Sequence, residues 1–230
     1  MSAAAFLPRL ALARPAQHPL ADTVRKAGWE PVPYAFTSLK VCTAPPPIPF
    51  TEAQALLVLS PSGAQVAAPR LPAGMLCLVQ GAGTADALGR EDLEVRLPFE
   101  ARAEALWELV QTTFPDGGDF ILARGERSRE YLEVATRGTA WRIHPWITHR
   151  EVARDPFPPL PDVEGVLALS PLQAEILAPI AHGVQRFAWG EATAEAFAQA
   201  GAPAHDRCEP KPGLLWAMLA QHLNKEESPC

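Results

Sequence analysis

The 230-residue chain contains four cysteines, and none of them belongs to a Cys-x-x-Cys pair. Metal sites and disulfide frameworks need closer or more regular groups than Cys42, Cys77, Cys208 and Cys230 form. We therefore expect reduced thiols, no metal and a cytoplasmic protein. Residues 1–12 carry one early positive charge and no small-residue cleavage site after a long apolar stretch, so we expect no signal peptide.

The chain also lacks an excess of positive charge and any long apolar run. It has 20 Lys and Arg against 26 Asp and Glu, which gives a net charge of −6. A nucleic-acid surface needs a basic patch, so we expect no nucleic-acid partner. No apolar run approaches the ~20 residues that cross a bilayer, so we expect no membrane association. Hydrophobic residues make up 48% of the chain, which is enough for a buried core.

The chain contains an internal repeat. One apolar run ends in Ser60-Pro61, and the segment Gly81-Ala82-Gly83-Thr84-Ala85 follows; a second run ends in Ser170-Pro171, and Gly190-Glu191-Ala192-Thr193-Ala194 follows. Gly81 lies 21 residues after Ser60, and Gly190 lies 20 residues after Ser170. The shared order and spacing indicate two similar structural units, and such a pair leaves a cleft between them.

Short apolar runs alternate with helical patterns along the chain, which is typical of βαβ units and parallel sheets. The run 55–59 is apolar at every position, as expected for a central strand covered on both faces. We predict strands at 10–13, 30–34, 55–59, 75–79, 93–97, 120–123, 166–169, 185–188 and 204–207, and helices at 19–27, 84–88, 101–114, 128–137, 172–181, 193–200 and 213–222. The predicted fold class is α/β, with two similar doubly wound parallel-sheet domains of the flavodoxin-like type.

Two proline-rich segments, 44–49 and 155–161, indicate stiff connections, because proline neither donates to a ladder nor continues a helix. The part before the first segment and the part after the second have too few predicted strands for a sheet of their own, but together they make a five-stranded unit. We therefore predict a discontinuous domain, residues 1–36 plus 153–230, interrupted by a continuous domain, residues 39–149. Two crossing segments join them and should let the domains close on a ligand.

The motifs, taken in order, resemble the uroporphyrinogen-III synthase family from Leu10 to about His222. Leu12-Ala13-Arg14-Pro15 resembles the family's opening strand and Arg-Pro turn, and Ser60-Pro61-Ser62 and Ser170-Pro171 resemble its two Thr/Ser–Ser/Pro steps. The two glycine–threonine segments resemble its paired Gly-Pro-x-Thr-Ala segments. Residues 124–130 resemble its Arg-Gly-Glu-x-x-Arg-Glu stretch. The ordered set is more specific than any single motif.

The chain departs from the family pattern in two places. Gly83 and Ala192 replace or shift the prolines that the family has in its glycine–threonine segments. The family's tyrosine is missing from the stretch 146–150, where Thr148 and His149 lie nearest its place. An acid role for that tyrosine therefore cannot be carried over to this chain.

The resemblance implies a lyase of haem and tetrapyrrole biosynthesis. Such an enzyme closes hydroxymethylbilane, a linear tetrapyrrole with eight carboxylates, into uroporphyrinogen III, with loss of water and inversion of the terminal pyrrole ring. It acts as a monomer, needs no metal or organic cofactor, and works by holding the ends of a flexible substrate together. The rival interpretation is a non-catalytic two-domain binding module that senses a small anionic ligand.

Carboxylates bind well at helix N-termini, which gather at the carboxyl edges of parallel strands. Two threonines at such positions, Thr84 and Thr193, are the predicted catalytic residues. The predicted substrate-binding residues are Arg14, Ser60, Ser62, Gly81, Arg124, Ser170 and Gly190. Serine and threonine are also the preferred helix caps, with proline favoured next to them, so capping alone explains several of these positions equally well.

Two further groups of side chains have alternative interpretations. Arg124, Arg127 and Arg129 crowd the start of a predicted helix, which indicates either an anionic ligand or neutralisation by neighbouring glutamates. His144 and His149 lie five residues apart without a third ligand, so we expect them at the surface rather than in a metal site.

Overall fold

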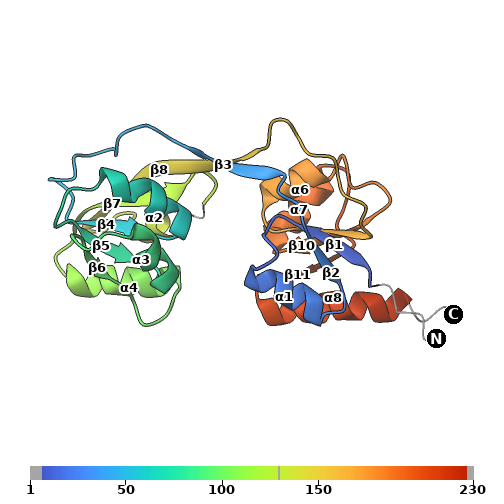
Figure 1. Ribbon diagram of the computed structural model, residues 1–230. Helices are drawn as coiled ribbons and strands as arrows, with labels where there is room; N and C mark the ends of the chain where they lie inside the picture. The colour runs from blue at the N-terminus through green and yellow to red at the C-terminus, as the bar shows by residue number, and fades with distance from the viewer. Residues whose placement is uncertain (1–6, 129, 227–230) are drawn as a thin grey trace. The chain divides into compact units, whose positions relative to one another are not determined.

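The computed structural model describes residues 7–128 and 130–226. The chain folds as two compact units, which we call the split unit (1–38 and 152–230) and the continuous unit (39–151). Each unit contains one β-sheet with helices on both faces (Figure 1). The fold is therefore α/β with two sheets. None of the helices in the described part of the chain combines the length and the apolarity that crossing a membrane requires.

The split unit has a five-stranded sheet in the order β11-β10-β9-β1-β2, and all its pairs are parallel. The strands are β1 (Arg9–Leu12), β2 (Glu30–Pro33), β9 (Gly165–Ala168), β10 (Gln185–Trp189) and β11 (Asp206–Cys208). On one face lie α1 (Pro19–Lys26) and α8 (Pro212–Glu226), and on the other lie α6 (Pro171–Leu177) and α7 (Glu191–Gln199). This arrangement is a doubly wound sheet.

The continuous unit has a six-stranded sheet in the order β3-β8-β7-β4-β5-β6. Its strands are β3 (Thr37–Val41), β4 (Ala55–Val58), β5 (Leu76–Val79), β6 (Glu94–Arg96), β7 (Gly118–Gly125) and β8 (Trp141–Ala153). Helices α2 (Pro61–Ala67) and α3 (Ala82–Leu88) cover one face, and α4 (Ala103–Thr113) and α5 (Tyr131–Ala135) cover the other, with a 3-10 turn at Ala68–Arg70. The sheet is mostly parallel.

Burial on both faces explains why the central strands are apolar at every position. All four residues of β4 are fully buried: Leu56 and Val58 pack under α2 and α3, while Ala55 and Leu57 pack under α4. Successive side chains of a strand point to opposite faces, so a strand between two helical layers needs an unbroken apolar run. The unbroken apolar run that predicted this strand is therefore explained by helices on both faces of the sheet.

The structure differs from the sequence prediction at β3 and β8, which were not predicted. The chain passes between the units within these two strands, at 38/39 and 151/152, and the strands are neighbours in the sheet. The backbone N–H of Cys42 donates to the Thr148 carbonyl oxygen at 2.8 Å. The proline-rich segments 44–49 and 155–161 lie a few residues from these crossings, inside the continuous and the split unit, respectively.

Candidate functional site

The predicted site residues fall into one set in each unit. In the continuous unit, Ser60, Gly81 and Arg124 lie at the carboxyl ends of β4, β5 and β7, which are neighbours in the sheet. In the split unit, residues follow the neighbouring strands β1, β9 and β10 in the same way: Arg14, Ser170 and Gly190. Each set therefore lies along the carboxyl edge of its own sheet, where ligands of open α/β sheets bind.

The two serines cap their helices with matching geometry. Ser60 has φ −149° and ψ 153°, and its Oγ accepts a hydrogen bond from the Gly63 N–H at 3.2 Å. Ser170 has φ −150° and ψ 158°, and its Oγ accepts from the Gln173 N–H at 3.3 Å. Ser62, the second residue of α2, is half-buried. The repeat in the sequence is thus a repeat in backbone conformation.

We expect Ser60→Ala to lower the free energy of unfolding by about 1 kcal/mol, because the Gly63 N–H loses its acceptor. Ser60→Gly should cost only a few tenths of a kcal/mol, because glycine is itself a tolerated cap. Urea unfolding followed by far-UV circular dichroism measures both. Equal losses in the two variants would show that the cap contributes nothing.

The next helix in each unit starts without a side-chain cap. Gly81 precedes α3 and Gly190 precedes α7, and neither helix receives a side-chain hydrogen bond at its N-cap. The following residues are exposed: Ala82, Gly83, Glu191 and Ala192. The first N–H groups of a helix have no intrahelical acceptor. Both sheet edges therefore place a serine-capped helix start beside a helix start whose main-chain donors remain for an outside acceptor.

The two glycines at these turns are needed for different reasons. Gly190 has φ +114°, a conformation that residues with a side chain rarely adopt. Gly81 has an ordinary extended conformation, with φ −173°, but a Cβ there would lie 3.0 Å from the Cβ of Ala101. Ala101 belongs to the loop after β6, and its carbonyl oxygen also accepts a hydrogen bond from Gln80 Nε2 at 3.3 Å.

Both threonines that were predicted as catalytic residues are buried in the structure. Thr84 is 5% exposed and Thr193 is 3% exposed, so neither hydroxyl lies on an open surface. Thr193 Oγ1 donates to the Trp189 carbonyl oxygen at 3.4 Å. The physical reason is helix periodicity, since each threonine lies four residues before a buried apolar residue of the same helix face, Leu88 or Phe197. The exposed part of each turn is its backbone.

Arg14 remains a candidate for binding an anion. It is half-buried just after β1, and its guanidinium donates to the Ala13 carbonyl oxygen at 2.8 Å. No carboxylate among the described residues forms an ion pair with it. Its charge acts on His18, whose pKa is lowered first by burial and then by Arg14.

Arg124, which was predicted as a substrate-binding residue, is buried and makes its contacts inside the continuous unit. Its side chain is 6% exposed and forms a short ion pair with Glu133 of α5. The guanidinium also donates to the Ser128 carbonyl oxygen at 2.7 Å and to the Gly125 carbonyl oxygen at 3.3 Å. Its donors are thus directed at the loop after β7 and at Glu133, and not outward. Arg129, of the same motif, lies outside the described residues.

The structure also corrects the surface location predicted for His149. His149 is 8% exposed and Thr148 is fully buried, so this stretch of β8 is part of the interior. His144, at the other end of the strand, contacts Asp119 through its Nε2 atom at 2.8 Å. No group of three or more metal-ligating side chains forms among residues 7–128 and 130–226. The sequence around Thr148 and His149 shows no apolar run and no motif, so it gave no signal that these two polar residues are buried.

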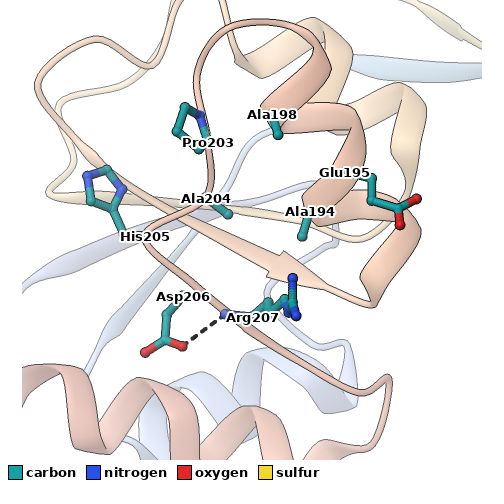
Figure 2. A pocket seen from close by; sticks show the side chains of 8 residues that line it. All are labelled: Ala194, Glu195, Ala198, Pro203, Ala204, His205, Asp206 and Arg207. Atoms are coloured by element: carbon teal, nitrogen blue, oxygen red, sulfur yellow. Dashed lines mark hydrogen bonds between the residues drawn. The ribbon is translucent and has the colours of Figure 1, made fainter.

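A separate hollow lies beside the edge strand β11, between that strand and α7 (Figure 2). Its wall is built from small apolar residues of α7 and from the segment that leads into β11, with Glu195, His205 and Asp206 around them. Asp206 Oδ1 accepts a hydrogen bond from the Arg207 N–H at 3.0 Å, and Arg207 forms an ion pair with Glu191 at 2.8 Å. Arg207, the arginine that lines this hollow, is therefore already paired.

No family model and no curated protein sequence matches this chain. Solved structures do match it. The structure of uroporphyrinogen-III synthetase from Helicobacter pylori 26695 matches with a TM-score of 0.62 at 10% identity, over 97% of this chain and 100% of that one. A mutant uroporphyrinogen III synthase from the extremely thermophilic bacterium Thermus thermophilus matches with a TM-score of 0.46 at 16% identity, over 96% and 97%. The chain thus has the two-sheet α/β fold of the Helicobacter pylori structure over nearly its full length.

Proposed function

We propose that this chain is a uroporphyrinogen-III synthase, a hydro-lyase that closes hydroxymethylbilane into uroporphyrinogen III with loss of water and inversion of the terminal pyrrole ring. It acts as a monomer and needs no metal or organic cofactor. The fold shared with the Helicobacter pylori synthetase supports the proposal, as does the resemblance of the ordered motifs. This reaction is a step of tetrapyrrole biosynthesis.

The observation that carries the proposal is the repeated sheet edge. Each unit has a serine-capped helix start next to an uncapped one that follows a glycine, and the exposed donors of the second are main-chain N–H groups. Main-chain N–H groups at helix starts suit carboxylates because they combine hydrogen-bond donors with the positive end of the helix dipole. A linear substrate with eight carboxylates provides acceptors for such donors.

The charge distribution favours local recognition over long-range attraction. The net charge of −6 repels an anionic substrate at a distance, so binding depends on donors at the edges themselves. Arg14 supplies a positive charge at the edge of the split unit. Glu191 is the first residue of α7, and its ion pair with Arg207 neutralises its charge there.

Such a site catalyses by holding the substrate, because hydroxymethylbilane closes without an enzyme into the non-inverted isomer. Fixing its carboxylates restricts a flexible chain to the conformation in which its two ends meet with the last ring inverted, and this supplies the advantage of proximity and orientation.

The direct test is to add the purified protein to freshly prepared hydroxymethylbilane, oxidise the products and separate the porphyrin isomers by chromatography. We expect isomer III, formed faster than isomer I forms in a protein-free control. Isomer I alone, at the rate of the control, would contradict the proposed activity. Substrate binding measured in the same preparation would then favour the non-catalytic binding module.

A charge placed in the uncapped turn separates substrate binding from stability. Gly83 is exposed, a Cβ added there would have no heavy atom within 4 Å, and its φ is not positive, so side chains fit there. We expect Gly83→Asp to raise the unfolding free energy by about 0.3–1 kcal/mol through the helix dipole. The same carboxylate should repel the substrate and lower kcat/KM by about 5- to 30-fold.

The matched controls are Gly83→Asn, which is uncharged, and Ala192→Asp, which makes the same change at the exposed turn of the split unit. The asparagine variant should keep kcat/KM within about twofold, since no charge is added, and Ala192→Asp should reproduce the loss. Steady-state kinetics and urea unfolding measure both quantities. Unchanged kcat/KM in both aspartate variants would remove the two turns from the proposed binding site.

A further inference from the structure

The buried pair Thr148 and His149 forms an ordered polar cluster that the proposed substrate binding does not use. Thr148 Oγ1 donates to the carbonyl oxygen of Arg124 on the neighbouring strand β7, at 3.2 Å. The same hydroxyl oxygen lies 2.9 Å from His149 Nδ1. Thr148 is fully buried and His149 is 8% exposed, so bulk water does not compete for these contacts.

These two contacts favour one tautomer of the imidazole. The Thr148 hydroxyl has one hydrogen, and the Arg124 carbonyl oxygen can only accept it. Towards His149 the hydroxyl oxygen is therefore an acceptor, which requires the hydrogen of the neutral ring to be on Nδ1. The other ring nitrogen, Nε2, then carries a lone pair and accepts a proton.

The Nε2 atom of His149 packs closely against the backbone of Gly125. A Cβ at Gly125 would lie 3.0 Å from His149 Nε2 and 3.3 Å from Ser128 Oγ, so only a residue without a side chain fits beside these two polar atoms. No hydrogen bond to Nε2 forms within the described residues. The strand pairing is irregular at this point, with a register shift between Arg124 and Gly125.

The contact between Gly125 and His149 lies along the same sheet edge as the proposed carboxylate donors. Gly125 is the last residue of β7, and β7 pairs directly with β4, which leads into Ser60. A Cβ at Gly63, in the first turn of α2, would lie 3.3 Å from the carbonyl oxygen of Ala123. The end of β7 is therefore in contact with the serine-capped helix start.

We propose that His149 is the proton-accepting residue of the cyclisation, with Thr148 as the residue that positions its ring. This inference rests on the proposed function. The substrate's hydroxyl leaves with a solvent proton as water, and its carbon forms a C–C bond to the substituted α-carbon of the terminal pyrrole. The bond from that carbon to the methylene bridge of the neighbouring ring then breaks, and the methylene bonds to the free α-carbon of the terminal pyrrole, which inverts the ring. The C–H bond of that α-carbon then breaks. Its electron pair restores the aromatic ring, and its proton moves to His149 Nε2, which later releases it to solvent.

The environment of His149 keeps the ring neutral, as a base requires. Burial lowers the pKa of His149 below its ordinary value of 6.5. The titratable and charged residues nearest to it along the adjoining strands are Cys42 just after β3, Arg124 on β7, Glu126 just after β7, and Arg150 on β8. Since the neutral ring is the active form, the rate falls as the pH falls through this lowered pKa.

The test compares His149→Gln with His144→Gln, which changes the histidine at the opposite end of the same strand. Isomer III formation by the unaltered chain comes first, and its absence would overturn the proposed function itself. Given that activity, His149→Gln should lower kcat by about 100-fold with little change in KM and should remove the acidic limb of the pH–kcat profile. His144→Gln should retain the wild-type kcat and the acidic limb of the profile. Wild-type kcat and pH profile in His149→Gln would overturn the role of His149 alone.

The positioning role of Thr148 has its own readouts. Thr148→Val removes the hydroxyl at constant shape, so kcat should fall by about tenfold, and Thr148→Ser should restore it to within about twofold. The nitrogen chemical shifts of ¹⁵N-labelled histidine should show the Nδ1–H form of His149 in the unaltered chain and in Thr148→Ser, and a mixture of tautomers in Thr148→Val. An Nε2–H form in the unaltered chain would overturn the inference even if a variant failed to fold.

Discussion

Arg124→Ala should lower the free energy of unfolding by about 3–5 kcal/mol, because it leaves a buried carboxylate without its partner. Arg124 is 6% exposed and the Glu133 side chain is 15% exposed, so both charges of the pair are shielded from water. The buried Glu133 Oε2 atom has no hydrogen-bond partner among the residues that the structure describes, so within them the Glu133 carboxylate depends on Arg124. The variant also takes the donor away from the Ser128 carbonyl oxygen.

The double variant Arg124→Met with Glu133→Leu distinguishes a lost attraction from a stranded charge. Removing both charges should restore most of the stability, because apolar residues of similar size can replace a buried ion pair at little cost. Arg142→Ala provides the surface control, since the Arg142 side chain is 64% exposed in its pair with Asp119, and it should cause a much smaller loss. Urea unfolding of the four proteins measures this. Equal losses in Arg124→Ala and Arg142→Ala would contradict a buried role.

The same comparison explains why the role of Arg124 could not be predicted from the sequence. Several arginines near a predicted helix start indicated an anionic ligand, because positive charge opposes the helix dipole there. The anion that Arg124 binds is Glu133, nine residues later, in a helix that begins only at Tyr131. The contact depends on how the loop after β7 folds back, and local spacing contains no information on that.

Strands with both faces covered could be predicted, and strands at the sheet margin could not. β4 is apolar throughout because helices pack on both sides of it. β8 contains Arg142, His144 and Pro145, and only parts of it are buried, so it shows neither an apolar run nor a clean alternation. β3 lies at the edge of the sheet and is at most half-buried. These two strands connect the units, so the nature of the crossings could not be predicted either.

For the candidate site, the position of each residue could be predicted but the direction of its side chain could not. The Ser-Pro steps and glycine turns predicted residues at helix starts, and in the structure these residues are the N-caps of their helices. Whether a side chain in the first turn points outward depends on which helix face is buried. Thr84 shares its face with Leu88 and is therefore inside. Considering the i, i+4 partner would have identified this.

The strand β8 is held in register at its start by a glycine turn, and this gives the second large expected effect. Gly117 has φ +90°, and a Cβ there would lie 2.4 Å from the carbonyl oxygen of Ala140, a contact that no side-chain movement can relieve. The next residue, Gly118, donates its N–H to that same oxygen at 3.0 Å and pairs with Trp141, the first residue of β8. Any side chain at Gly117 must therefore push the start of β8 away from β7.

We expect Gly117→Ala to lower the unfolding free energy by about 3 kcal/mol or more, the sum of an unfavourable left-handed backbone and a clash with main-chain atoms. Gly138→Ala is the matched control in the same unit, since Gly138 has φ +72° but nothing within 4 Å of the added Cβ, and it should cost only about 1–2 kcal/mol. Urea unfolding compares the two. Because β8 also carries His149, a displaced register should lower isomer III formation in Gly117→Ala and leave it unchanged in Gly138→Ala. Equal stability of the two variants would show that the Ala140 contact does not hold β8 in place.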